Sequence, residues 1–326
     1  MRAALPRLIV PLAAALLLAA GPARAAEFEK KSSEILFGAG AVYPVAFSPD
    51  GKWIAAGTDR GRLKVWDIEG RKFVADLKGL EDSLLWTVAF SPDGKLLASG
   101  ASDNTARVWD IATSKEVAKI DTFGDRVTGV AFSPDGKTLA ACSNDGTAVL
   151  FDLGAKKVKF TLKKHTDAVR GVAFAPDGKS VATAGKDKQV LLWNAETGKP
   201  RLGVTFGEIL YSCVFTPDGK QLIVAGGEEF RGKDNSIKLI DLEKKGQPAL
   251  LTGHTSSIWS LSLTADGKTL ASSGYHDQTA RLWDVGGKSS KGVLKAGDDV
   301  RNVAISPDGK TLAVVSGTGV TLWSVK

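Results

Sequence analysis

Short stretches of alternating apolar and polar residues recur at a nearly constant interval along the chain. Val88-Ala89-Phe90 is one such stretch, and Val130-Ala131-Phe132 and Val172-Ala173-Phe174 repeat it at intervals of 42 residues. A second apolar stretch follows each of them after a tight turn, as in Leu96-Leu97-Ala98-Ser99. A period of two residues predicts β-strands. Because no stretch has the period of an amphipathic helix, the pattern predicts an all-β fold.

The turn between these two strands carries the tetrapeptide Pro-Asp-Gly-Lys. Proline presets φ, aspartate bonds to nearby amides, and glycine accepts a positive φ, so the tetrapeptide suits a tight turn. The copies begin at Pro49, Pro92, Pro134, Pro176, Pro217 and Pro307, with Ala265 beginning a variant. The successive intervals are 43, 42, 42, 41, 48 and 42 residues. Seven units of this length indicate a propeller or a solenoid.

Each unit has room for two further strands. In the second unit, the third strand covers residues 106–110 and a weaker fourth covers residues 116–120. Third strands end in Trp66-Asp67, Trp109-Asp110 and Trp283-Asp284, with the variants Phe151-Asp152, Trp193-Asn194, Ile240-Asp241 and Trp323-Ser324. These pairs resemble the signature dipeptide of the WD-repeat family, and Gly253-His254 resembles its Gly-His pair. The resemblance covers about residues 34–326 and implies a seven-bladed β-propeller of four-stranded antiparallel blades.

The last unit lacks a fourth strand, because the chain ends just after its third strand at residues 320–325. Residues 34–37 are similar to residues 292–295, where a fourth strand leads into a new unit. We therefore expect this N-terminal strand to complete the last blade and close the ring, as the family resemblance implies. Closure removes an open sheet edge. Residues 26–326 are thus expected to form one domain.

The resemblance also implies a hydrogen-bonded tetrad of histidine, Ser or Thr, aspartate and tryptophan within a blade. The matching sets are His165, Thr183, Asp187, Trp193 and His254, Ser272, Asp277, Trp283, with Ser273 a rival for the serine. A buried histidine and a buried aspartate are tolerated only when they are paired. A catalytic triad is the alternative interpretation. We favour the structural role because the set repeats at a position that serves packing, and we expect no catalytic residues.

One position of the repeat is rich in residues typical of binding hot spots. The family resemblance places the residue six positions before each turn on the top face, at the mouth of the central channel. These residues are Tyr43, Trp86, Thr128, Arg170, Tyr211, Trp259 and Arg301, with Arg126, Lys186 and His276 expected nearby. Aromatic residues and arginine dominate binding hot spots. We therefore predict a partner-binding ring that includes Arg126, with packing between blades as the alternative.

The longest interval places extra residues in a loop at 226–233. Phe230 lies in this otherwise polar loop and is a further candidate contact. Loops that depart from a scaffold often carry function, although a tolerated insertion is an equal alternative.

The first 25 residues have the layout of a secretory signal peptide. Arg2 and Arg7 precede an apolar stretch at residues 8–20, and Ala23-Arg24-Ala25 offers a small-x-small cleavage site. The apolar stretch is shorter than the roughly 20 residues that a membrane span needs. The pattern predicts cleavage before Ala26 and no membrane span afterwards, with an uncleaved anchor as the alternative. It favours an extracytoplasmic location, periplasmic or secreted, in a bacterium.

Charge and rare residues limit the remaining function classes. Removing Arg2, Arg7 and Arg24 lowers the formal net charge from +7 to +4. Because lysine and aspartate alternate, we expect no nucleic-acid partner. Cys142 and Cys213 lie within apolar stretches and are expected to be buried free thiols. With three histidines in the chain, we expect no metal site and no cofactor.

These observations predict a non-catalytic scaffold that binds a protein or a peptide on the top face of the propeller. The main alternative is a propeller enzyme, such as a lactonase or a hydrolase, that uses the central channel. A third hypothesis is a channel stabilised by calcium, with Asp298, Asp299 and Glu208 as contributors.

Overall fold

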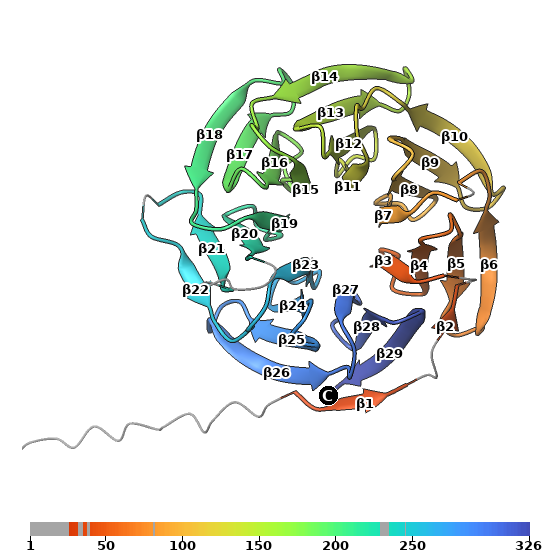
Figure 1. The fold of residues 1–326 in the computed structure, drawn as a ribbon, viewed down its shortest axis with the longest axis vertical. Coiled ribbons are helices and arrows are strands. Elements are labelled where there is room, and N and C mark those ends of the chain that lie inside the picture. The colour runs from red at the N-terminus through yellow and green to blue at the C-terminus, as the bar shows by residue number, and fades with distance from the viewer. Residues whose placement is uncertain (1–25, 32–34, 38–39, 81, 229–234, 245) are drawn as a thin grey trace, which may run out of the picture.

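Seven antiparallel sheets are arranged as blades around a central channel in the computed structural model (Figure 1). The structure describes residues 26–31, 35–37, 40–80, 82–228, 235–244 and 246–326. Every strand pair has antiparallel register, and no helix occurs within these ranges. The seven-bladed propeller of four-stranded blades is therefore confirmed.

The strands of each blade run from the channel to the circumference. The inner strands of blades 1 to 7 are β3 (Val42–Phe47), β7 (Leu85–Phe90), β11 (Val127–Phe132), β15 (Val169–Phe174), β19 (Leu210–Phe215), β23 (Ile258–Leu263) and β27 (Val300–Ile305). The second strands are β4 (Trp53–Thr58), β8 (Leu96–Ala101), β12 (Thr138–Ser143), β16 (Ser180–Gly185), β20 (Gln221–Gly226), β24 (Thr269–Gly274) and β28 (Thr311–Ser316). The third strands are β5 (Leu63–Asp67), β9 (Ala106–Asp110), β13 (Thr147–Asp152), β17 (Gln189–Asn194), β21 (Ile237–Asp241), β25 (Thr279–Asp284) and β29 (Gly319–Val325). The outer strands are β6 (Lys72–Leu77), β10 (Lys115–Ile120), β14 (Lys157–Lys163), β18 (Pro200–Thr205), β22 (Ala249–Leu251) and β26 (Ser289–Lys295), with β1 (Phe28–Lys30) and β2 (Ile35–Leu36) in blade 7.

The ring closes through N-terminal residues that pair with the last strand, as expected. Ile35 of β2 pairs with Val320 of β29, and Phe28 of β1 pairs with Val325 (Figure 1). The closing strand therefore has two pieces and begins earlier than the expected residues 34–37. The backbone amide of Lys326 donates to the Glu27 carbonyl at 3.0 Å, which ties the two ends of the described chain together.

The hydrophobic core is divided into layers, each shared by two neighbouring blades. The layer between blades 7 and 1 contains Phe37, Val42 and Leu322, and Phe37 is fully buried. Trp109 and Trp283 occupy the same kind of layer, and each is 1% exposed. Because each blade buries its faces only against its neighbours, stability depends on an unbroken ring.

The Pro-Asp-Gly-Lys turns are held by a local hydrogen-bond network. In blade 2, the Ser91 hydroxyl donates to Asp93 Oδ1 at 2.6 Å, and the Lys95 amide donates to the same oxygen at 3.1 Å. Gly94 has a φ of 71°, which favours glycine there. The Ser91 hydrogen bond lowers the pKa of the Asp93 carboxyl. The equivalent hydroxyl lowers the pKa of Asp135, Asp218, Asp266 and Asp308.

These turns are expected to make the fold sensitive to acid. A carboxyl whose pKa is lower in the folded state stabilises that state above its ordinary pKa of about 3.9, and this stability is lost as pH falls through the lower value. We predict that the variant Asp93→Asn/Asp135→Asn/Asp308→Asn is less stable at pH 7 and loses less stability between pH 5 and pH 2 than the unchanged chain. Urea unfolding across this range measures both effects. An identical pH dependence in the two proteins would contradict this prediction.

Candidate partner-binding face

A hollow of about 240 Å³ lies on the top face, which we define as the face opposite the Pro-Asp-Gly-Lys turns. We call it the top-face hollow. Its described lining residues are Tyr43, Trp86, Arg126, Thr128, Arg170, Lys186, Tyr211, Trp259, Arg301 and Asn302. Most of them lie near the start of an inner strand, where the chain enters a blade from the top face. The structure therefore brings together the ring positions expected from the repeat, while Phe230 lies outside the described residues.

Two pairs of aromatic rings border the hollow. Tyr43 and Trp86 meet edge to face with their ring centroids 5.7 Å apart, and Tyr211 and Trp259 stack at 5.9 Å. Trp259 also stacks on Tyr275 at 4.0 Å with an angle of 12° between the rings. These contacts join blades 1 and 2 and blades 5 and 6, so the rings do pack between blades. The four side chains are nevertheless only half-buried and leave part of their faces to the hollow.

Four cationic side chains complete the lining. The Arg126 guanidinium lies 4.7 Å from the Trp86 ring centre, and the Arg301 guanidinium lies 5.3 Å from the Tyr43 ring centre. Arg301 also donates to the Gly317 carbonyl at 2.9 Å. Cation–π contacts of this kind position a guanidinium without neutralising its charge. No carboxylate stands among the described lining residues.

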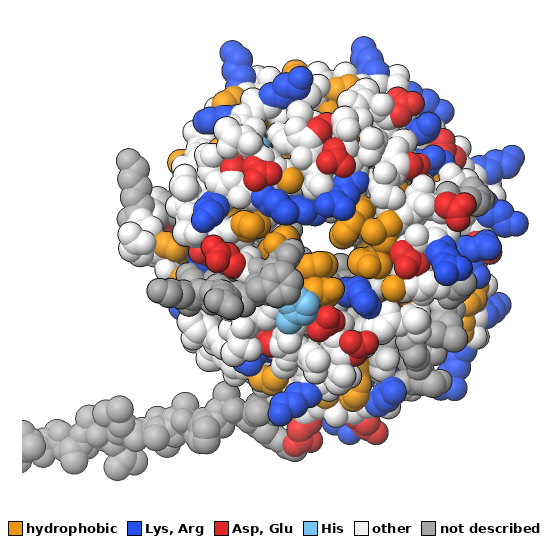
Figure 2. Space-filling model, viewed as in Figure 1, with side chains coloured by type: hydrophobic (Ala, Val, Ile, Leu, Met, Phe, Trp, Pro, Cys, Tyr) orange, Lys and Arg blue, Asp and Glu red, His pale blue; other side chains and the backbone are white. Residues whose placement is uncertain are grey.

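The surface view shows how these side chains are distributed around the channel. Blue side chains border the central hole on one side, and orange side chains border it on others (Figure 2).

Thr128 differs from its ring neighbours because its hydroxyl donates to the Val169 carbonyl of the next blade at 2.6 Å. That hydroxyl therefore links two blades.

The acids expected near the channel do not form a cluster. Glu208 forms a buried ion pair with Lys238, whose side chain is 3% exposed, and Asp299 lies 3.3 Å from His276 Nδ1. Burial lowers the pKa of Lys238 to about 8. Among the described residues, no group of three or more His, Cys, Asp or Glu side chains is arranged to hold a metal ion. Glu208, Asp298 and Asp299 thus do not make the calcium site of the third hypothesis.

The histidine tetrads of blades 4 and 6 have the geometry of a structural network. In blade 4, His165 Nδ1 lies 2.9 Å from both Asp187 carboxylate oxygens, and Nε2 lies 2.8 Å from the Thr183 hydroxyl. Trp193 Nε1 donates to the same hydroxyl at 2.8 Å. Because a carboxylate only accepts hydrogen bonds, Nδ1 carries the proton in this network. The His165 and Asp187 side chains are 1% and 3% exposed, so the set is closed to a substrate.

Blade 6 repeats this network with serine as the hydroxyl. His254 Nε2 lies 2.7 Å from the Ser272 hydroxyl, and Trp283 Nε1 donates to it at 2.8 Å. Ser272, and not Ser273, therefore holds the serine position. Burial opposes ionisation of Asp277, but hydrogen bonds from His254, Thr279 and the Thr255 amide outweigh it and lower its pKa to about 2.

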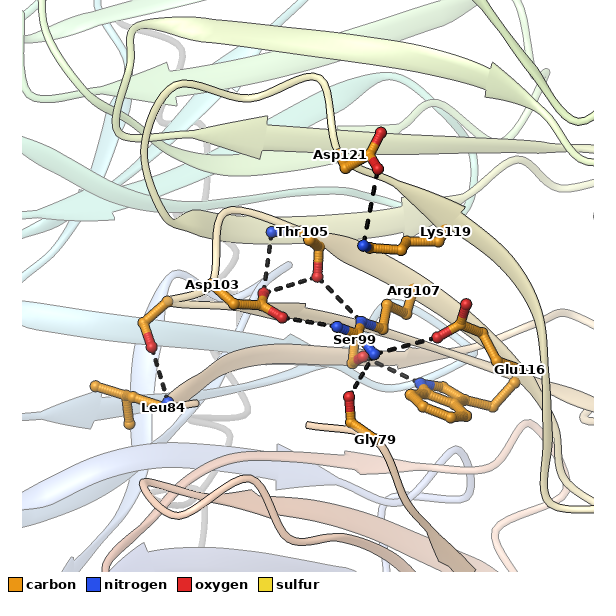
Figure 3. A network of polar contacts seen from close by, with 11 residues as sticks. Gly79, Leu84, Ser99, Asp103, Thr105, Arg107, Glu116, Lys119 and Asp121 are labelled. Atoms are coloured by element: carbon orange, nitrogen blue, oxygen red, sulfur yellow. Dashed lines mark hydrogen bonds and ion pairs between the residues drawn. The ribbon is translucent and has the colours of Figure 1, made fainter. Parts of the chain in front are cut away.

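Blade 2 lacks the histidine and uses arginine instead. Leu80 follows Gly79 where blade 6 has Gly253-His254, and Leu80 is 1% exposed. Arg107 donates to Asp103 Oδ2 at 2.9 Å, to the Gly79 carbonyl and to Glu116 at 3.3 Å (Figure 3). This role of Arg107 was not predicted from the sequence, although a leucine at the histidine position of this blade signals that Asp103 needs another partner.

The sequence predicts the state of the two cysteines correctly but does not predict the contact of Tyr275. Tyr275 stacks against Trp259, and the repeat pattern did not predict this contact. Cys142 and Cys213 are buried and free, and burial raises the pKa of the Cys142 thiol to about 12. The expected signal peptide at residues 1–25 lies outside the described residues. Within the described ranges, no helix is long and apolar enough to span a membrane.

A family model confirms the repeat. The model for "WD domain, G-beta repeat" (WD40) matches residues 33–67, 71–110, 115–152, 156–194 and 246–284, which is more than half of the chain. Each match starts at or near an outer strand and ends with the third strand of the following blade. The first match joins β2 of blade 7 to the strands of blade 1, in agreement with the observed closure.

Several known proteins are similar over part of this chain. "Serine-threonine kinase receptor-associated protein" of Gallus gallus is 28% identical over 41% of the chain and 37% of its own length. "U3 small nucleolar RNA-associated protein 12" of Saccharomyces cerevisiae is 30% identical over 38% of the chain and 14% of its own length. "Intraflagellar transport protein 122 homolog" of Xenopus tropicalis is 35% identical over 35% of the chain and 9% of its own length. The matches thus span well under two thirds of each relative.

The organisms and names of these relatives contradict the location expected from the sequence. The relatives are proteins of eukaryotes, and their names refer to small nucleolar RNA and to intraflagellar transport. The prediction of a bacterial, periplasmic or secreted protein is therefore wrong. It depends on a short apolar segment at residues 8–20, and the apolar character of such a segment does not identify the source of a chain. From the matched repeats and the seven closed blades, the chain belongs to the WD40 repeat family.

Proposed function

We propose that this protein is a scaffold that binds a protein partner through the top-face hollow. The observation that carries the proposal is the lining itself: half-buried tryptophan, tyrosine and arginine side chains converge on one hollow from different blades. These residue types dominate the energetics of protein interfaces. Two of the relatives are named for their association with a serine-threonine kinase receptor and with a small nucleolar RNA, which supports a role in assembly.

The wider channel favours the scaffold over an enzyme. Below the hollow, the channel has a volume of about 600 Å³ and is lined mainly by small, apolar and hydroxyl side chains such as Ser260, Ser262 and Ala304. A hydrolase needs a nucleophile or a metal together with acid–base groups in hydrogen-bond reach. The Thr-His-Asp set of blade 4 and the Ser-His-Asp set of blade 6 are instead buried inside their blades. We retain, as predictions, that the protein uses no cofactor and no metal and that its partner is not a nucleic acid.

The test compares partner capture by three forms of the full chain. We expect the unchanged chain to retain a protein from an extract of its own organism, and the variant Trp86→Ala/Arg170→Ala/Trp259→Ala to lose it. The matched control Lys95→Ala/Lys137→Ala/Lys220→Ala changes three exposed turn residues of the opposite face and should retain it. Thermal unfolding must show that all three forms are folded.

The outcomes separate the hypotheses. Equal retention of the same protein by the unchanged chain and the top-face variant would contradict binding in the hollow. Retention of nothing, combined with turnover of lactones or esters in a substrate screen, would replace the scaffold with the propeller enzyme.

A further inference from the structure

The charges of the top-face hollow are arranged on two opposite sides of the channel. Arg126, Arg170 and Lys186 belong to blades 3 and 4, and Arg301 belongs to blade 7. Figure 1 shows that β11 and β15 lie across the channel from β27. The two aromatic pairs lie on blades 1 and 2 and on blades 5 and 6, which are the two remaining sides. Cationic and aromatic sides therefore alternate around the mouth.

The lining also offers hydrogen-bond donors that have no acceptor. Trp86 Nε1 and Arg301 Nε are both buried atoms without a hydrogen-bond partner. Buried donors are normally paired, so each such atom calls for an acceptor. None of the ion pairs between described residues includes Arg126, Lys186 or Arg301. The hollow is thus rich in donors and positive charge and contains no described carboxylate.

We infer that the occupant of the top-face hollow is an extended acidic segment of the partner protein. Its carboxylates bind the cations on the two opposite sides, and the chain between them passes between the aromatic pairs. Carboxylates accept from Arg and Lys in strong charge-assisted hydrogen bonds. Desolvation in a half-enclosed site strengthens this attraction relative to that in water. This inference rests on the proposed function and specifies the chemistry of its partner.

The arrangement favours separate carboxylates over a phosphate group or a nucleic acid. A single phosphate dianion is bound best by cations that converge on one point. It would leave Arg301, which lies across the channel from the other three cations, without an anion. A nucleic acid needs a continuous basic track along its backbone. Here the cations are divided between two separate places around the mouth, and Asp298 and Asp299 stand in the loop before β27 on the same face.

The test is a binding titration of the full chain with labelled peptide libraries. The first library contains nine-residue N-acetylated peptides with two Glu residues separated by one to five positions among Gly, Ala and Leu. Three further libraries replace both Glu residues with Gln, with Lys or with phosphoserine. Fluorescence anisotropy gives the affinity at 50 mM and 500 mM salt.

We expect only the Glu library to bind well, and we expect its affinity to fall at high salt. Lys186→Glu and Arg301→Gln should each weaken it about tenfold or more, because each removes a cation that binds a carboxylate. Lys137→Glu carries the same charge change as Lys186→Glu but lies in a turn of the opposite face, and it should leave the affinity unchanged. Arg301→Gln also removes the hydrogen bond to the Gly317 carbonyl and can therefore disturb the blade 7 turn. In that case the result for Lys186→Glu decides the test.

The contradicting outcomes are distinct. The inference of an acidic segment would be overturned by equal binding of the Glu and Gln libraries or by tight binding of the phosphoserine library alone. It would also be overturned if Lys137→Glu lowered the affinity for the Glu library as much as Lys186→Glu does. If capture of a partner still depends on Trp86, Arg170 and Trp259, the proposed function survives that failure. If partner capture does not depend on these three residues either, then both the proposed binding in the hollow and the inferred acidic segment are wrong.

Discussion

Deleting residues 26–37 from the full chain is expected to abolish its cooperative unfolding transition. The deletion removes β1 and β2 and leaves the outer edge of β29 without a partner. It also removes Phe37, which is fully buried, and Ile35, which is 7% exposed, from the layer between blades 7 and 1. Loss of one buried phenylalanine side chain costs about 3–5 kcal/mol. Because a whole domain is stable by only about 5–15 kcal/mol, the combined loss is comparable with the total.

Calorimetry and size-exclusion chromatography measure the result. We expect the deleted chain to lose its unfolding peak and to associate through the exposed strand edge. The control is Glu29→Ala, which removes an exposed ion pair with Lys326 within the same segment and should have little effect. A deleted chain that unfolds cooperatively within a few degrees of the full chain would show that the closing strand is dispensable.

Replacing Lys238 with methionine is expected to lower the free energy of unfolding by about 3–5 kcal/mol. Lys238 pairs with Glu208, and the two side chains are 3% and 8% exposed. The ammonium also donates to the Ser236 carbonyl at 3.0 Å. Methionine has nearly the same length but leaves the Glu208 carboxylate buried without its counter-charge. The large cost comes from that unpaired charge rather than from the lost attraction.

A double-mutant cycle in denaturant unfolding tests this explanation. The variant Lys238→Met/Glu208→Gln should recover much of the loss, because it no longer contains a buried charge. Lys310→Met is the matched control, because its ion pair with Asp308 is exposed and should contribute less than about 1 kcal/mol. Additive losses at Lys238 and Glu208 would mean that the two groups do not compensate one another.

Much of the fold follows from chemistry that each repeat carries locally. The turn at Pro92 has its own hydroxyl–carboxylate network, and the strands on either side alternate apolar and polar residues, so the sequence predicts this unit without reference to its neighbours. The constant interval then places equivalent side chains at equivalent heights in every blade. This is why Trp86 and Trp259, from distant parts of the chain, were expected at one mouth and line the same hollow.

What sequence reasoning missed depends on pairings between distant segments. The three-residue strand β1 has two exposed residues and no alternation of its own, and it forms only because β29 offers a free edge. Arg107 reaches the Gly79 carbonyl, which is 28 residues away, and Lys238 pairs with Glu208 from a distant loop. Tyr275 stacks on Trp259 from the turn that follows β24. None of these contacts is encoded by a local pattern.

Site-specific photo-cross-linking tests most directly whether the top-face hollow is the interaction surface. A photoreactive phenylalanine analogue would replace Tyr43, Tyr211, Lys137 or Phe73, one at a time, in the full chain within cells. Tyr43 and Tyr211 line the hollow, Lys137 lies in a turn of the opposite face, and Phe73 is exposed on outer strand β6. We expect one protein to be cross-linked from Tyr43 and Tyr211 and not from Lys137 or Phe73. Cross-links from Lys137 or Phe73, with none from the two tyrosine positions, would contradict it.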